Sequence, residues 1–217
     1  CVVCYHKGGV RTMSQVESGS TFWSVQKRFR ATWFGLVLTL LTGCTGSEQL
    51  SQNSVSQEAW QFELLDGREI MPFEDTNVKA IVLVFIATDC PIANAYQPEI
   101  TNIQKRFSKR GIQFLFVHPD RDITKADAET HARQFRIDIP IVLDKELRIA
   151  RRVNAEVTPQ AIVIQRGITT PVYRGAIDNR YAGYGKKRPA PDQHYLIEAL
   201  SDILANKPVS NAETKPV

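Results

Sequence analysis

The chain has 217 residues, of which 43% are hydrophobic and 23% are charged, and its formal net charge is +4. This length suits one domain with tails, and the composition excludes disordered, collagenous and multi-span membrane proteins. The whole charge excess lies in residues 1–43, where five basic residues accompany one acidic residue, whereas residues 44–217 hold 22 of each sign. The sequence therefore predicts no nucleic-acid partner for the main part of the chain.

Near the N-terminus, the basic segment Lys27–Arg30 precedes an uncharged apolar run from Ala31 to Leu41. The run is shorter than the roughly 20 residues that span a bilayer, and a basic segment before a short apolar one is typical of an export signal. It ends at Leu41-Thr42-Gly43-Cys44, which resembles the bacterial lipobox. The resemblance implies cleavage before Cys44, lipidation of its sulfur, and a periplasm-facing membrane lipoprotein exported to the bacterial cell envelope. An ordinary signal peptide or a short buried helix is the alternative interpretation.

The leader is followed by a polar stretch. Residues 44–58 are rich in Ser and Gln, so we expect a flexible tether behind the lipidated Cys44. The first methionine is Met13, and a long polar stretch precedes the basic segment. We therefore interpret residues 1–12, or 1–24 with a start at Val25, as lying outside the natural product.

The chain contains four cysteines, and their positions reduce the number available for chemistry. Cys1 and Cys4 precede the expected cleavage point, and Cys44 would carry lipid. Cys90 is then the one free thiol in the mature protein. Such a thiol is notable in an exported protein because the compartment is oxidising.

From Ala59 onward, patterns typical of strands and helices alternate. We expect strands at 60–64, 80–87, 112–117, 139–143, 161–164 and 172–173, and helices at 92–109, 124–135, 145–153 and 194–205. The run Ala80–Ala87 is continuously apolar, as in a strand buried on both faces of a sheet. Thr124 or Asp122 is expected to cap a helix. The alternation predicts an α/β domain at 59–206, with a loose tail at 207–217.

The strand at 80–87 leads into Thr88-Asp89-Cys90-Pro91, which places Cys90 at the start of a helix. Pro91 suits the first helical position, where a missing N–H costs nothing. The cysteine would then face free backbone N–H groups and the positive end of the helix dipole, which favours the nucleophilic thiolate over the thiol. The charge of Asp89 opposes this effect. Cys90 is the candidate nucleophile, and a buried structural cysteine is the alternative.

Three segments around this site resemble proteins of the thioredoxin fold. Phe85–Ala93 resembles the active-site segment with Cys90 at its first cysteine, Pro98 matches the proline of the active-site helix, and Val157–Gln160 resembles the cis-proline loop. Over residues 59–205 the chain is most similar to the redoxin or peroxiredoxin-like (AhpC/TSA-type) branch. The resemblance implies a thioredoxin-like three-layer fold, with a central mixed sheet flanked by helices.

The resemblance also implies roles for individual residues. It places a cis Pro159 beside Cys90, with Thr158 and Pro159 docking substrate and Thr88, Asp89 and Pro91 supporting the site. The sequence departs from the pattern of these families at three positions. Ala93 replaces the second cysteine of thioredoxins, Ala87 replaces the threonine of peroxiredoxins, and Val84 replaces the buried acid of thioredoxins.

These features predict an envelope-tethered thiol oxidoreductase or antioxidant that acts through the single nucleophile Cys90 on disulfides or peroxides. We expect no bound cofactor. Because no second thiol remains in the mature chain, we expect an external thiol to act as the reductant. The expected partners are the membrane, through Cys44, and a thiol or disulfide protein. One alternative is a copper-handling protein, for which Cys90 and His118 supply only part of a metal site. Another is a binding protein that has lost catalysis.

Other polar and aromatic residues receive simpler interpretations. His118 is expected in a solvated loop, His131 on the solvated face of a helix, and Lys186–Arg188 in a solvated loop. Trp60 and Tyr96 are expected to be packing residues.

Overall fold

The computed structural model describes residues 60–183 and 185–216. The predicted leader, the lipidation site Cys44 and the tether lie outside the described residues. The strands are β1 (Phe62–Glu63), β2 (Glu69–Ile70), β3 (Ala80–Phe85), β4 (Ile112–His118), β5 (Ile141–Leu143), β6 (Gln160–Gln165), β7 (Tyr173–Gly175), β8 (Tyr181–Gly183) and β9 (Lys186–Lys187). The α-helices are α1 (Pro91–Phe107), α2 (Lys125–Phe135), α3 (Arg148–Val153) and α4 (Tyr195–Leu204), and short 3-10 helices lie at Pro72–Glu74 and Ser108–Arg110.

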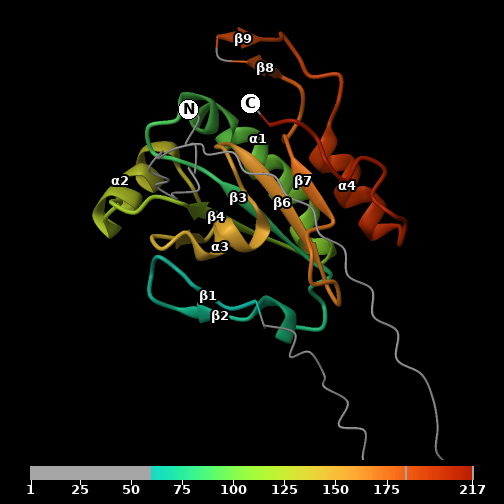
Figure 1. Cartoon of the computed structure of the whole chain (residues 1–217), viewed down its shortest axis with the longest axis horizontal. Helices are drawn as coiled ribbons and strands as arrows, with labels where there is room; N and C mark the ends of the chain where they lie inside the picture. Colours follow the sequence, from blue (N-terminus) through green and yellow to red (C-terminus); the bar gives the residue numbers. More distant parts are fainter. Residues whose placement is uncertain (1–59, 184, 217) are drawn as a thin grey trace, which may run out of the picture. The chain divides into compact units, whose positions relative to one another are not determined.

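Five strands form the central sheet in the order β5-β4-β3-β6-β7 (Figure 1). The pairs β3–β4 and β4–β5 are parallel, whereas β3–β6 and β6–β7 are antiparallel. All six residues of the central strand β3 are buried, as its continuous apolar pattern predicted. The sheet is therefore mixed, in agreement with the sequence-based expectation.

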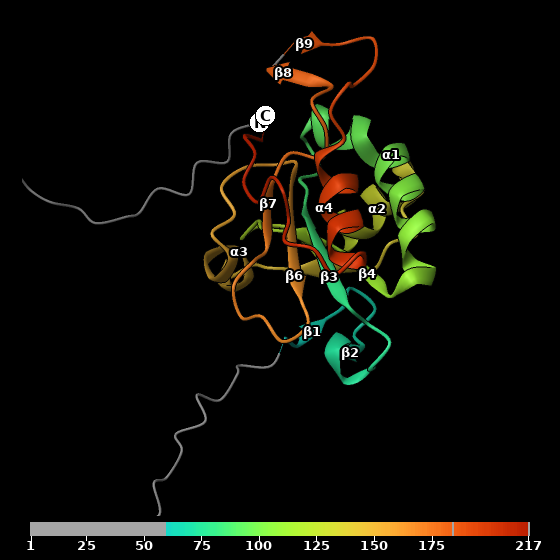
Figure 2. The same cartoon turned by 90° about the vertical axis from the view of Figure 1, so that its right-hand side faces the viewer.

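Helices cover both faces of this sheet. Figure 2 shows α3 on one side and α1, α2 and α4 on the other. The alternation of side chains along β3 divides the core accordingly: Val82 and Val84 pack in the cluster that contains α1 and α4 residues, and Ile81, Leu83 and Phe85 pack with α3. This confirms the predicted three-layer arrangement. In the described part, no helix is both long enough and apolar enough to cross a membrane.

Local signals set the ends of the main helices. Thr124 caps α2 through a capping box, in which its side chain accepts from the Asp127 backbone N–H while the Asp127 carboxylate accepts from the Thr124 backbone N–H. Gly111 ends the 3-10 turn after α1 with a φ of 90°, a conformation that favours glycine. The helix α1 continues through Pro98.

The C-terminal segment differs from the expected loose tail. The Arg174 N–H donates to Ala212 O at 2.8 Å, and the Thr214 N–H donates to Arg174 O at 3.1 Å. These bonds hold the segment beside β7. Gly175 allows the close approach, because a Cβ there would lie 2.0 Å from Thr214 Oγ1. A polar composition alone could not show that an open sheet edge lies within reach of this segment.

Lys186–Arg188 also departs from the expected solvated loop. Lys186 and Lys187 form β9, which pairs antiparallel with β8 in a hairpin. Both lysines and Arg188 are exposed, so the expected solvation is confirmed and the loop assignment is wrong. Two- and three-residue strands are too short to produce a readable alternation of polar and apolar residues.

Candidate functional site

The candidate site is the corner between β3 and α1. Cys90 is the N-cap of α1, and Pro91 is the first helical residue, as predicted. Cys90 Sγ accepts a hydrogen bond from the Ala93 backbone N–H at 3.4 Å. The thiol is buried within this corner. The helix therefore presents a backbone donor to the sulfur, and a negative charge on the sulfur would be stabilised there.

The loop before β6 lies directly against this cysteine. The peptide bond between Thr158 and Pro159 is cis, and the Cys90 thiol donates to Thr158 O at 3.3 Å. Thr158 and Pro159 are both buried, and within the described part of the chain Thr158 Oγ1 has no hydrogen-bond partner. The structure thus confirms the predicted cis bond and its position beside Cys90.

Other predicted support residues contribute through the backbone or lie at the surface. Thr88 O accepts a hydrogen bond from Asn94 Nδ2 at 3.0 Å, so the segment before Cys90 is tied to the first turns of α1. Asp89 is exposed. Ala87 and Ala93, which stand where related proteins have a hydroxyl and a second thiol, supply neither group here. Among residues 60–183 and 185–216, Cys90 is the only cysteine.

Two histidines behind the corner were expected to be solvated, and the structure shows both buried. His118 is the last residue of β4 and is fully buried, and His131 lies on the inner face of α2 with 3% of its surface exposed. Their ring centroids are 5.3 Å apart. His131 Nε2 donates to Asn94 Oδ1 at 2.8 Å. We call His118 and His131 the histidine pair.

Burial keeps the histidine pair uncharged near neutral pH. It lowers the pKa of His118 to about 4, with a further contribution from the neighbouring His131 ring, and burial also lowers the pKa of His131. Within the part that the structure describes, both ring nitrogens of His118 and Nδ1 of His131 lack a hydrogen-bond partner. No group of three or more His, Cys, Asp or Glu side chains among the described residues could hold a metal ion.

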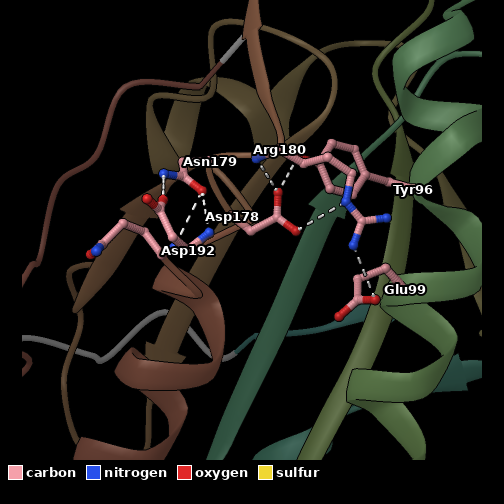
Figure 3. Close-up of polar contacts among 7 residues, drawn as sticks. Tyr96, Glu99, Asp178, Asn179, Arg180 and Asp192 are labelled. Atoms are coloured by element: carbon pink, nitrogen blue, oxygen red, sulfur yellow. Dashed lines mark hydrogen bonds and ion pairs between the residues drawn. The ribbon is translucent and has the colours of Figure 1, made fainter. Parts of the chain in front are cut away.

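A second, partly buried polar cluster lies on another flank of α1 (Figure 3). The Tyr96 hydroxyl donates to Asp178 Oδ1, which also accepts from the Arg180 backbone N–H at 2.8 Å. The Arg180 guanidinium lies 3.8 Å from Asp178 Oδ2 and 3.6 Å from Glu99 Oε2. Burial, and then the hydrogen bond and charge of Asp178, raise the pKa of Tyr96. We call Tyr96, Glu99, Asp178 and Arg180 the Asp178 network.

Sequence reasoning missed the residues that connect these clusters to α1. Tyr96 was expected only to pack, and it does pack, but it also anchors Asp178. Trp60 is a packing residue as predicted, stacked on Phe62 and covered by the Arg152 guanidinium. A half-buried helical asparagine such as Asn94 gives no distinct signal in a single sequence, because an exposed asparagine looks the same.

Comparisons with known proteins agree with this architecture. The AhpC/TSA family model matches residues 55–171. An uncharacterized conserved protein from Geobacillus kaustophilus has a TM-score of 0.61 at 21% identity, covering 73% of this chain and 86% of that chain. A hypothetical protein from Sinorhizobium meliloti 1021 has the same TM-score at 16% identity, with 73% and 87% covered. A candidate thioredoxin from Neisseria meningitidis has a TM-score of 0.53 at 17% identity, with 71% and 91% covered. No curated protein matches.

These comparisons carry different weight. The solved structures are too dissimilar in sequence to show more than a shared fold, and that fold is the thioredoxin-like arrangement described above. The family model covers more than half of the chain, including β3, α1 and the cis-proline loop. The chain belongs to the AhpC/TSA family.

Proposed function

We propose that this protein is a thiol oxidoreductase in which Cys90 attacks a disulfide of a partner protein. The observation that carries the proposal is the position of Cys90 Sγ, 3.4 Å from the Ala93 N–H and 3.3 Å from Thr158 O. The N–H at the helix start would stabilise the thiolate that performs the attack. The adjacent cis-proline loop supplies backbone groups beside the sulfur for an extended substrate segment.

The proposed reaction exchanges one disulfide for another. The Cys90 thiolate attacks one sulfur of the partner's disulfide, the partner's S–S bond breaks, and a mixed disulfide forms. The released partner thiolate takes up a proton from solvent. An external thiol then attacks the mixed disulfide and restores the Cys90 thiol. The external thiol is required because the described domain contains no second cysteine.

Peroxide reduction is a second candidate, and membership of the AhpC/TSA family favours it. The Cys90 thiolate would attack one peroxide oxygen and break the O–O bond, giving a sulfenic acid and, after protonation, water. Ala87 weakens this candidate because it offers no hydroxyl to hold the peroxide. We rank disulfide exchange first because the loop at Thr158 and Pro159 lies directly against the sulfur.

We also propose that the protein acts at the bacterial cell envelope, tethered through a lipidated Cys44. The lipobox-like sequence Leu41–Cys44 behind a basic and apolar leader supports this location. Metabolic labelling with a fatty acid tests it. The unaltered chain should incorporate label into the membrane fraction, and Cys44→Ser should not. Labelling that persists in Cys44→Ser would contradict the tether.

The central experiment uses the full chain carrying Cys1→Ser, Cys4→Ser and Cys44→Ser, so that Cys90 is its only thiol. The reduced protein is mixed with glutathione disulfide or with hydrogen peroxide, and mass spectrometry identifies the Cys90 product. We expect a mixed disulfide that an added thiol removes, and a Cys90→Ser control without any product. Fast sulfenic acid formation with slow disulfide exchange would favour the peroxidase.

Access to the buried thiol is part of this test. Alkylation of Cys90 should be slower in the native protein than in the unfolded one, but measurable, because a substrate must reach the sulfur. A thiol that reacts only after unfolding would contradict both catalytic candidates and favour the binding protein. Copper binding that requires both Cys90 and His118 would favour the copper-handling alternative.

A further inference from the structure

The β8–β9 hairpin carries a concentrated positive charge. Lys186, Lys187 and Arg188 are consecutive and exposed, and residues 181–188 include no acidic residue. Asp192 is the acidic residue beside them, and its pKa is lowered mainly by a hydrogen bond from Asn179 and also by the charge of Arg188. Since residues 44–217 are neutral overall, this local excess is a feature of the hairpin.

The hairpin lies at the end of the sheet where Cys90 is found. Both β3 and β7 run antiparallel to β6, so β3 and β7 point the same way. The chain leaves β3 toward Cys90 and leaves β7 toward the hairpin, so both segments begin at the same end of the sheet. Figures 1 and 2 both show β8 and β9 projecting beyond the end of the sheet at which α1 begins. The Tyr181 ring lies 5.3 Å from the Tyr96 ring of α1.

The base of the hairpin is fixed by side chains (Figure 3). On one side, the Asp178 network joins Arg180, the residue before β8, to α1. On the other side, Asn179 Oδ1 accepts from the backbone N–H groups of Asp192 and Gln193 at 3.1 and 3.2 Å, and the Asn179 amide donates to the Asp192 carboxylate. The Arg188 N–H donates to Arg180 O at 2.7 Å.

This anchoring has a consequence for recognition. A charged group held in place before a partner arrives loses less conformational entropy on binding than a group on a free loop. Lys187 Nζ also lies 5.8 Å from the centroid of the Tyr181 ring, which is itself packed against α1. The backbone that carries the basic residues is therefore held in place at the end of the sheet where Cys90 lies (Figure 1).

We propose that the β8–β9 hairpin docks an acidic segment of the protein whose disulfide reacts with Cys90. The proposal rests on the function proposed above, and charge complementarity identifies the occupant. Cations beside a reactive site attract acidic partners and raise the rate of encounter at low salt. The shared position of the hairpin and Cys90 at one end of the sheet favours a reacting protein over a lipid surface as the occupant.

The test compares two peptide disulfides that differ only in the residues around the cysteine, glutamates in one and glutamines in the other. The full chain with Cys90 as its only thiol is used, and the rate constant for mixed-disulfide formation is measured at low and high salt. The glutamate peptide should react roughly tenfold faster at low salt. High salt should remove this preference.

Three variants connect the preference to the hairpin. Lys186→Gln/Lys187→Gln/Arg188→Gln should abolish it and leave the rate with the glutamine peptide unchanged. Replacing the same residues by Glu should reverse it toward a lysine-flanked peptide. The matched control removes equal charge from exposed lysines in the last turn of α1 and just beyond the ends of α1 and α4, as Lys105→Gln/Lys109→Gln/Lys207→Gln. This control should keep the preference.

Each remaining outcome has a defined meaning. Equal rates with both peptides in the unaltered hairpin would overturn the docking proposal and leave the proposed function standing. No reaction with either peptide would overturn the proposed function and the docking proposal together. A preference that survives the glutamine substitutions would overturn the role of the hairpin. Hairpin-dependent binding to phosphatidylglycerol vesicles, without any peptide preference, would assign the surface to lipid instead.

Discussion

The helix that begins at Cys90 has two flanking polar clusters, and they are built in different ways. The histidine pair is fully enclosed and makes one hydrogen bond to α1, through Asn94. The Asp178 network lies toward the hairpin and joins a carboxylate, a guanidinium and a phenol through several contacts. Both clusters attach a neighbouring element to α1, but one is nearly neutral and the other carries charge.

The difference follows from what each group can do on burial. A histidine can lose its charge, and burial lowers the pKa of His118 to about 4, which favours the neutral ring near neutral pH. A buried carboxylate is stable only with compensating donors and cations, which Tyr96 and Arg180 supply to Asp178. Acid should therefore destabilise the protein through the histidine pair, because it protonates these rings. The Asp178 network should instead lose its stabilising effect when one of its partners is removed.

The largest expected effect comes from breaking the Asp178 network. Asp178→Ala should lower the free energy of unfolding by about 3 kcal/mol, because it removes the acceptor for the Tyr96 hydroxyl and leaves Arg180 without this counter-charge. Tyr96→Phe is the milder comparison and should lose about 1 kcal/mol. Urea unfolding measures both. If Asp178→Ala cost no more than Tyr96→Phe, the network would not be held by the carboxylate.

The next effect concerns pH and the histidine pair. His118 has a pKa of about 4 in the folded protein and an ordinary value of 6.5, so the unfolded state binds an extra proton between these values. The free energy of unfolding should therefore fall as the pH drops below about 6.5. The loss assigned to His118 should reach roughly 2 kcal/mol near pH 4.5.

The matched variant for this prediction is His118→Gln, which cannot titrate. Urea unfolding of both proteins at neutral and acidic pH gives the difference that belongs to His118, since the carboxylates titrate in both. Parallel curves for the two proteins would contradict the burial of a neutral His118.

A smaller effect is expected where the histidine pair meets the reactive corner. Asn94→Ala removes the acceptor for His131 and the donor to Thr88 O, and should cost about 1–2 kcal/mol. It should also alter the alkylation rate of Cys90, because the segment before Cys90 loses its hydrogen bond to α1. Asn102→Ala makes the same change at an exposed site on α1 and should leave both values nearly unaltered. If the two variants had equal effects on stability and alkylation rate, Asn94 would have no special role.

The smallest effect concerns the helix that carries His131. Thr124→Ala breaks the capping box at the start of α2 and should cost about 1 kcal/mol in thermal or urea unfolding. Thr130→Ala, an exposed change within the same helix, should cost less. A Thr124→Ala variant as stable as Thr130→Ala would show that contacts with the core, and not the cap, hold α2 in place.

Two parts of the site were predicted from neighbours in the chain: the apolar run at Ala80 signals a buried strand, and the proline after Cys90 signals a helix start. The cis Thr158–Pro159 bond beside Cys90 was expected from the resemblance to thioredoxin-fold proteins, and the structure places it as expected. The burial of His131 had no such signal. Its helix is largely polar, with only Ala128 and His131 buried, so its pattern is that of a solvated helix.

The sequence by itself determined the α/β order and the helix start at Cys90, because these depend on hydrophobic pattern and on the backbone limits of proline. The position of the proline loop beside Cys90 was expected only from the resemblance to thioredoxin-fold proteins. The tertiary structure alone decided which polar residues became partners. Tyr96 and Asp178 are 82 residues apart in the chain, and His118 meets His131 only because β4 and α2 pack together. Local patterns carry no information about such contacts, since burial and pairing depend on how distant elements come together in the folded chain.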